Sequence, residues 1–153
     1  MQVEHSILVL ATAERIFRIY ENVAVWHTWD PDTRRASLEG PFAVGSRGSL
    51  TPTKGNTVPM LITKVKPNSC FTVESKIPLF RMVFEHELVA QGNAVKVTHR
   101  VTFSGLLSMM LGRMLVKQLN MVFRSPLQAS NAWQRVQPNP LSSGAPTAGH
   151  FEL

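Results

Sequence analysis

Turn-forming residues divide the chain between Thr33 and Ser104 into six short segments, and this feature constrains the fold more than any other. Glycine, proline and asparagine favour tight turns, while the segments between them carry β-branched and aromatic residues in short runs. Strands that such short turns join must pair antiparallel. We therefore predict an antiparallel sheet whose six consecutive strands span 33–39, 46–52, 57–66, 69–77, 80–90 and 94–104.

A strand and two short helices are predicted before these six strands. Residues 3–10 read VEHSILVL, which is typical of a strand. Thr12 stands where an N-cap is favoured, and apolar residues follow it at helical spacing. A second short helical turn is expected to end at the sequence DPD of residues 30–32, because the residue before a proline avoids the helical conformation. The stretch VWHTWDPD of residues 25–32 is then a helix end and a turn, with His27 at the surface.

The hydrophobic period changes again after Gly105. Over 106–124, apolar residues lie on one side of a helical projection and basic or amide residues on the other, which predicts a long amphipathic helix. The Ser-Pro pair at 125–126 can begin a further helical piece. Residues 137–153 are rich in proline, glycine and serine and predict a disordered tail.

These elements indicate one α+β domain over residues 1–136, followed by the tail 137–153. A chain of 153 residues is long enough for one core and too short for two ordinary ones. An antiparallel sheet has one face to bury, and the helix 106–124 is the largest apolar surface that can cover it. We expect the sheet to curl around this helix and to leave a cavity between them.

Composition limits the classes of function. No stretch approaches the roughly 20 apolar residues that span a bilayer, and the amino-terminal stretch lacks the pattern of a signal peptide. The single cysteine, Cys70, cannot form an internal disulfide, which fits a reducing compartment. We therefore expect a soluble cytoplasmic protein, either a monomer or a homodimer.

The net charge of +6 invites the hypothesis of nucleic-acid binding, because clustered basic residues gain affinity by releasing phosphate counterions. The 16 lysines and arginines are spread from Arg15 to Arg135 without a run of three. Scattered charge of this kind is typical of a solvated surface. We expect no direct nucleic-acid partner.

Two histidines share the phase of the buried residues in the last two strands. In the segment 80–90, His86 alternates in step with Phe84 and Leu88, and in 94–104 His99 alternates in step with Val97 and Val101. If Gly92 and Asn93 form a two-residue hairpin turn, paired residues have numbers that sum to 185. His86 then lies opposite His99.

The same register pairs apolar residues inside and opposite charges outside, which favours it independently. Inside, it sets Phe84 against Val101 and Leu88 against Val97; outside, it sets Glu85 against Arg100. Two imidazoles this close on an apolar face resist double protonation, so at least one is expected to be neutral. A neutral imidazole can bind a ligand hydroxyl or carbonyl, or shuttle a proton. The alternative is that the pair hydrogen-bonds itself or trapped water inside the core.

Other residues support a ligand site less directly. Gln118 falls within the apolar half of the predicted helix, where it either faces the cavity or reaches solvent from the border. Met114 neighbours it and is of a type that lines adaptable pockets. Cys70 is out of phase with Phe71, which places its thiol outside the cavity. The sequence has no phosphate loop, nucleophile elbow or zinc-binding helix motif, and His86 and His99 lack a third inward ligand, so we predict no metal and no cofactor.

Four motifs follow one another along the chain: LATAERIF at 10–17, WHTWDPD at 26–32, GPFAVGSRGSL at 40–50 and VTFSGLL at 101–107 before a long helix. Together they resemble the START-like helix-grip superfamily, and most closely its polyketide cyclase/dehydrase and lipid-transport branch. The resemblance covers about residues 3–136. It implies a seven-stranded curved antiparallel sheet that grips the terminal helix around a cavity for apolar or aromatic molecules. It implies no catalytic residue, because the superfamily shares none.

Three functions remain open. The first is binding of a hydrophobic or aromatic small molecule, such as a lipid, a polyketide or a quinone, in the cavity. The second is a cyclase, dehydrase or isomerase in which His86 or His99 acts as general acid and base. The third is an interaction protein that uses the basic helix stripe of Arg113, Lys117 and Arg124. The residues expected to line the cavity are His86, His99, Gln118, Phe71, Phe84, Val97, Phe103, Met114 and Trp29.

Overall fold

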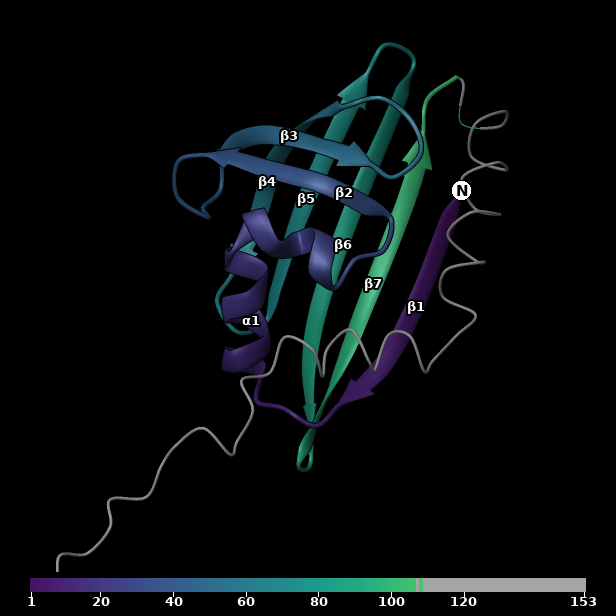
Figure 1. Cartoon of the computed structure of the whole chain (residues 1–153). Helices are drawn as coiled ribbons and strands as arrows, with labels where there is room; N and C mark the ends of the chain where they lie inside the picture. Colours follow the sequence, from purple (N-terminus) through teal and green to yellow (C-terminus); the bar gives the residue numbers. More distant parts are fainter. Residues whose placement is uncertain (107, 109–153) are drawn as a thin grey trace, which may run out of the picture.

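A computed structural model describes residues 1–106 and residue 108 and contains one seven-stranded antiparallel sheet (Figure 1). The predicted α+β class and the seven strands are confirmed, with strand ends that differ from prediction by one residue at most. The strands are β1 (Gln2–Val9), β2 (Thr33–Glu39), β3 (Arg47–Pro52), β4 (Val58–Lys66), β5 (Cys70–Ile77), β6 (Phe80–Gln91) and β7 (Ala94–Ser104).

The strand order is β1-β7-β6-β5-β4-β3-β2, so only β1 leaves the order of the chain. Strands β2 to β7 form a continuous antiparallel meander, as the short turns predicted. The first strand pairs with the last, antiparallel, from Gln2 opposite Thr102 to Val9 opposite Val95. β1 and β2 are therefore the two edges of the sheet. The sheet is strongly curved (Figure 1).

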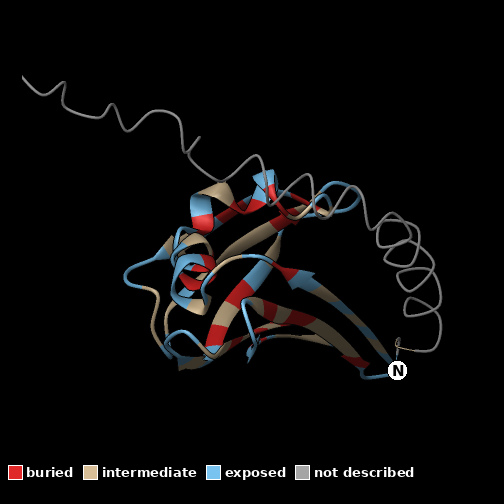
Figure 2. Ribbon diagram, turned by 90° about the horizontal axis from the view of Figure 1, so that it is seen from below, coloured by how far each residue is buried: buried red, intermediate tan, exposed pale blue. Residues whose placement is uncertain are grey.

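Two short helices lie on the concave side of the sheet. The helix α1 (Ala13–Glu21) is capped by Thr12, whose hydroxyl accepts a hydrogen bond from the backbone N–H of Arg15 at 3.2 Å. The 3₁₀ helix η1 (Val23–Thr28) follows and packs against β2. Figures 1 and 2 show both helices on one side of the sheet. The apolar faces of α1 and η1 pack against the inward-facing residues of the strands.

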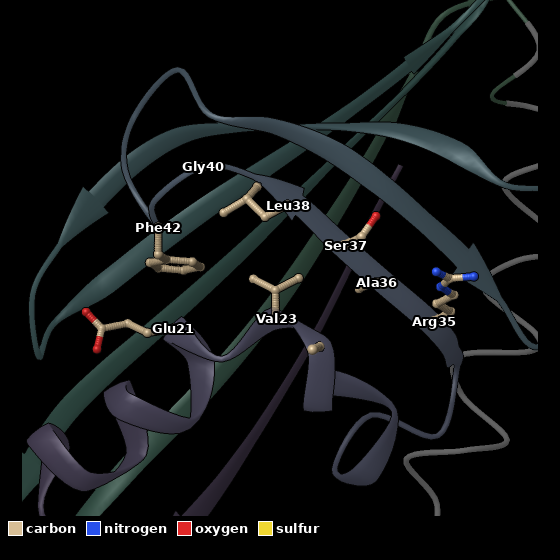
Figure 3. Close-up of a pocket in the computed structure, with 9 residues that line it drawn as sticks. Glu21, Val23, Arg35, Ala36, Ser37, Leu38, Gly40 and Phe42 are labelled. Atoms are coloured by element: carbon tan, nitrogen blue, oxygen red, sulfur yellow. The ribbon is translucent and has the colours of Figure 1, made fainter.

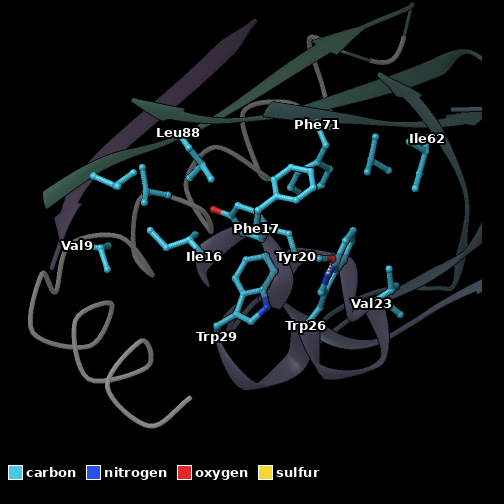
Figure 4. Close-up of a cluster of buried hydrophobic side chains, with 14 of the residues drawn as sticks. Val9, Ile16, Phe17, Tyr20, Val23, Trp26, Trp29, Ile62, Phe71 and Leu88 are labelled. Atoms are coloured by element: carbon cyan, nitrogen blue, oxygen red, sulfur yellow. Dashed lines mark hydrogen bonds between the residues drawn. The ribbon is translucent and has the colours of Figure 1, made fainter. Parts of the chain in front are cut away.

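The core lies between these helices and the sheet (Figure 4). Buried and more exposed residues alternate along β5, which is the two-residue period expected for a sheet with one buried face. The largest fully buried side chains come from both layers: Tyr20, Phe17, Phe71, Ile16, Ile62 and Val97.

The predicted register of the last hairpin is confirmed. Gln91 pairs with Ala94 around the turn, and every pair from Arg81–Ser104 onward follows the predicted sum, including His86 opposite His99. Gly92 has a φ of +62°, which a turn residue without a Cβ adopts at no steric cost. On the outer face, Nη1 of Arg100 lies 3.7 Å from Oε2 of Glu85, the pair of opposite charges that the register predicted.

Some predicted elements lie outside the described residues. These are nearly all of the helix 106–124, including Met114 and Gln118, the further helical piece and the tail 137–153. Within the described residues, no helix is long and apolar enough to cross a membrane.

Two glycines with nearly equal φ allow the energetic cost of backbone strain to be measured separately from the cost of steric overlap. Gly105 and Gly40 have nearly equal φ values, +104° and +105°, but an added Cβ would overlap the carbonyl of Leu79 at Gly105 and meet nothing within 4 Å at Gly40. We expect Gly40→Ala to lower the free energy of unfolding by about 1 kcal/mol from φ strain alone. Gly105→Ala is expected to cost about 2–3 kcal/mol, because the β5–β6 turn must also move. Urea denaturation of both variants measures the difference, and equal losses would contradict it.

Candidate functional site

His86 and His99 lie side by side on the concave face of the sheet. Their ring centroids are 4.4 Å apart and the rings meet edge to face at 66°. Phe71 on β5, which pairs with His86, stacks on that imidazole with centroids 4.1 Å apart and an angle of 5°. The two histidines and this phenylalanine therefore form one continuous aromatic row across β7, β6 and β5.

Strand β1 extends this row with a third histidine. His5 pairs with His99 in the β1–β7 ladder, so three neighbouring strands each place a histidine at the same level. Burial lowers the pKa of His99, and repulsion from the nearby His5 lowers it further. His5 was missed in the sequence analysis. Its signal was the alternation of Val3, His5 and Ile7. That alternation points to the site only once β1 pairs with β7, the first and last strands along the described chain.

The helices cover the row with two further aromatic residues. The hydroxyl of Tyr20 on α1 lies 3.0 Å from Nε2 of His99, and its ring is 5.5 Å from that of His86. Trp29, just after η1, contacts both imidazoles, with centroids 6.4 Å and 5.9 Å away. Tyr20 is one of the apolar residues at helical spacing after Thr12, and the sequence analysis did not identify it as a site residue. The hydroxyl on an otherwise buried helix face was the signal that could have identified it.

Burial keeps both imidazoles neutral at physiological pH. It lowers the pKa of His99 from 6.5 to about 4, with repulsion from His5 as the second cause. Burial also lowers the pKa of His86 well below 6.5, and repulsion from His99 adds to this. The neutral state expected from the register is thus favoured for both residues.

The Tyr20 hydroxyl keeps its proton in this environment, because burial raises its pKa well above the usual value of 10. It can donate to Nε2 of His99 when that ring carries its proton on Nδ1, or accept from Nε2 in the other tautomer. The Nδ1 atom of His86 is buried and makes no hydrogen bond within the part of the chain that the structure describes.

The other predicted lining residues occupy different places. Trp29 and Phe71 are in contact with the histidines, and Phe84 and Val97 belong to the same core cluster or pack on it. Phe103 is buried farther along β7 and stacks on Phe80, with centroids 5.9 Å apart and an angle of 17°. The structure therefore brings four predicted site residues together as one group of touching rings, namely Trp29, Phe71, His86 and His99.

The stretch 25–32 divides between core and surface. Trp26 and Trp29 are buried, whereas His27 is exposed, as predicted. The Asp30 carboxylate accepts hydrogen bonds from the Thr33 hydroxyl at 2.7 Å and the Asp32 backbone N–H at 3.0 Å. Burial and the neighbouring Asp30 raise the pKa of Asp32 to about 6, and burial raises that of Asp30. This stretch forms a structural corner with one residue, Trp29, in the candidate site.

A separate hollow of about 430 Å³ lies between the α1–η1 junction and the edge strand β2 (Figure 3). Glu21 and Arg35 lie at its rim, and apolar side chains such as Val23, Leu38 and Phe42 line it. It contains none of the predicted site residues. Within the described residues there is no group of three or more histidine, cysteine or acidic side chains that could hold a metal ion.

The chain matches no protein-family model, and no curated protein is significantly similar to it in sequence. Solved structures do resemble it. Protein MLL2253 from Mesorhizobium loti is 14% identical, with a TM-score of 0.67 over 90% of this chain and 100% of that one. A START superfamily protein from Mycobacterium smegmatis is 12% identical, with a TM-score of 0.63 over 88% and 94%.

Norcoclaurine synthase from Thalictrum flavum, solved in complex with dopamine and hydroxybenzaldehyde, is 12% identical, with a TM-score of 0.64 over 91% of this chain and 89% of that one. Identities this low show the fold alone. The seven-stranded sheet and the helices α1 and η1 have the START-like fold, which confirms the fold, and only the fold, that the sequence motifs implied. The ligand and the chemistry have to be argued from the site itself.

Proposed function

We propose that this protein binds a hydrophobic or aromatic small molecule on the concave face of its sheet, beside His86 and His99. The observation that carries this proposal is the buried Nδ1 atom of His86, which has no hydrogen-bond partner within the described residues. A buried polar atom without a partner is destabilising, so its retention needs an explanation. A ligand hydroxyl or carbonyl that completes its hydrogen bonding supplies one.

The surroundings of His86 suit a neutral, flat molecule. Phe71 and Trp29 surround His86 with aromatic rings, and an aromatic environment stabilises other rings in stacked or edge-to-face geometry. A largely apolar site with a few polar groups that fix orientation is the usual form of a small-molecule site. A quinone, a phenol or a polyketide-like ring fits this chemistry better than a charged metabolite, because both imidazoles are neutral.

A second candidate function is general acid–base catalysis of the cyclase, dehydrase or isomerase type. The hydrogen bond between Tyr20 and His99 favours it, because a hydroxyl and a neutral imidazole 3.0 Å apart can pass a proton between them. The pKa of His99, about 4, makes it a weak base near pH 7, so we rank this function second. The third candidate, an interaction through Arg113, Lys117 and Arg124, concerns residues outside the described part.

The variant His86→Phe tests the proposed binding function. It keeps a ring to stack on Phe71 but removes both ring nitrogens. Against a panel of 2-naphthol, 1,4-naphthoquinone and naphthalene, we expect the wild-type melting temperature to rise with all three. In His86→Phe, affinity for the two oxygenated compounds should fall about tenfold, which corresponds to one lost hydrogen bond, while naphthalene binding should be unchanged.

Thermal-shift and calorimetric titrations measure these effects, and native mass spectrometry of the freshly purified protein shows any retained ligand. The control His27→Ala removes an exposed histidine and should leave every affinity unchanged. A wild-type protein that retains no small molecule and is stabilised by none of the panel would contradict the proposed function.

A further inference from the structure

Among the described residues, a second polar atom on the same face of the sheet is buried and unpaired. The Oγ of Ser75 on β5 makes no hydrogen bond within the described residues, and the residue is only 3% exposed. Most buried serines donate to a backbone carbonyl or a neighbouring side chain. Ser75 and His86 thus each have a buried polar side-chain atom that makes no hydrogen bond within the described residues.

The register places Ser75 and His86 on one line along the β5–β6 ladder. Phe71 pairs with His86, and Ser75 is four residues farther along β5, opposite Met82. Four residues of an extended strand span about 13 Å, so the two polar groups are separated by that order of distance. Val73 and Phe84, which pair with each other, lie between them on the same face.

The surface between the two polar groups carries no charge. The inward residues of this part of the ladder are apolar apart from Ser75 and His86 themselves, and the hydroxyl of a serine can either donate or accept a hydrogen bond. A molecule that lies along this line meets a polar atom at each end and an apolar floor in the middle.

We infer that the ligand of this site is an elongated, uncharged molecule of about two fused or linked rings, with an oxygen function at each end, one for His86 and one for Ser75. This inference rests on the proposed binding function and narrows its ligand class. Ser75 then determines specificity for length and for the second oxygen. A ligand with a single polar end leaves the serine hydroxyl without a partner.

Biphenyl-4,4′-diol and 4-hydroxybiphenyl are matched probes, because they differ in one terminal hydroxyl. By isothermal titration calorimetry, we expect the wild type to bind the diol about tenfold more tightly than the mono-ol. The Ser75→Ala variant should bind the diol about tenfold more weakly and the mono-ol unchanged. Ser104→Ala, an exposed serine at the end of β7, is the control and should change neither affinity.

Stability of the ligand-free protein gives a second measurement. Removing a buried hydroxyl without a partner is expected to raise the melting temperature, whereas removing one that bonds within the protein or to trapped water lowers it. A lower melting temperature of Ser75→Ala, or equal affinity of this variant and the wild type for the diol, would overturn the role of Ser75. That result leaves the proposed function intact if His86→Phe still weakens the binding of both probes. Binding of neither probe, together with failure of the naphthalene panel, overturns the inference and the proposed function alike.

Discussion

Replacement of Phe71 by alanine is expected to lower the free energy of unfolding by about 3–5 kcal/mol, the range for removing a large aromatic side chain from a packed core. Phe71 is fully buried, at 0% exposure. Its ring stacks on His86 at 4.1 Å and contacts Tyr20 at 4.9 Å and Phe42 at 5.2 Å between centroids. Few neighbours can relax into the space, because these rings come from three different elements.

Comparison with Phe71→Leu separates apolar volume from ring geometry. Leucine keeps much of the buried apolar area but cannot stack on His86, so a smaller loss of about 1–2 kcal/mol is expected. Leu10→Ala, at a residue that is 75% exposed, serves as the surface control and should change stability by about 0.5 kcal/mol or less. Urea denaturation followed by tryptophan fluorescence measures all three. A loss below about 1 kcal/mol in Phe71→Ala would show that this ring is not a core contact.

The His86–His99 pair could be predicted from sequence because its geometry is local. Both residues lie in one hairpin, so strand phase and a two-residue turn at 92–93 fix which residues face each other. Glu85 and Arg100 face each other in this register, and their opposite charges support it independently of the apolar residues. Short-range periodicity and turn chemistry were sufficient for this part of the site.

The rest of the site depends on contacts that periodicity does not encode. His5 reaches His99 only because β1 adds to the edge of the sheet beside β7, and no turn links those strands. Tyr20 reaches His99 only because α1 packs across the concave face. A helix pattern shows which residues are buried, but not which strand residue each of them meets. Tertiary packing determines which strand residue each helix residue contacts, and the resemblance to START-like proteins predicted only the overall fold.

The two neutral histidines are expected to make folding stability depend on pH below about 6.5. The folded-state pKa of His99 is about 4, against an ordinary value of 6.5, and that of His86 is also well below 6.5. Between these values the unfolded chain binds more protons than the folded one, so the free energy of unfolding falls as the pH falls. For His99 alone the shift corresponds to about 3 kcal/mol, lost progressively from pH 6.5 to pH 4.

Two aspartates act in the opposite direction over part of this range. The pKa of Asp32 is raised to about 6 and that of Asp30 is also raised, so each carboxyl binds its proton more readily in the folded state. Their contribution to stability therefore grows as the pH falls below about 6. The wild-type curve alone mixes both effects, and only a difference between two proteins isolates the histidines.

The variant His99→Gln gives that difference, because it removes the buried titrating ring and keeps a polar group that Tyr20 can bond. The aspartates remain in both proteins, so their contribution cancels when the two stability curves are subtracted. We expect the wild type to lose about 3 kcal/mol relative to the variant between pH 6.5 and pH 4, measured by urea denaturation at each pH. The exposed control His27→Gln should follow the wild-type curve. Parallel curves for the wild type and His99→Gln would show that His99 accepts a proton as readily in the folded state as in the unfolded chain. That result would remove the basis for a neutral, water-excluded histidine pair at the candidate site.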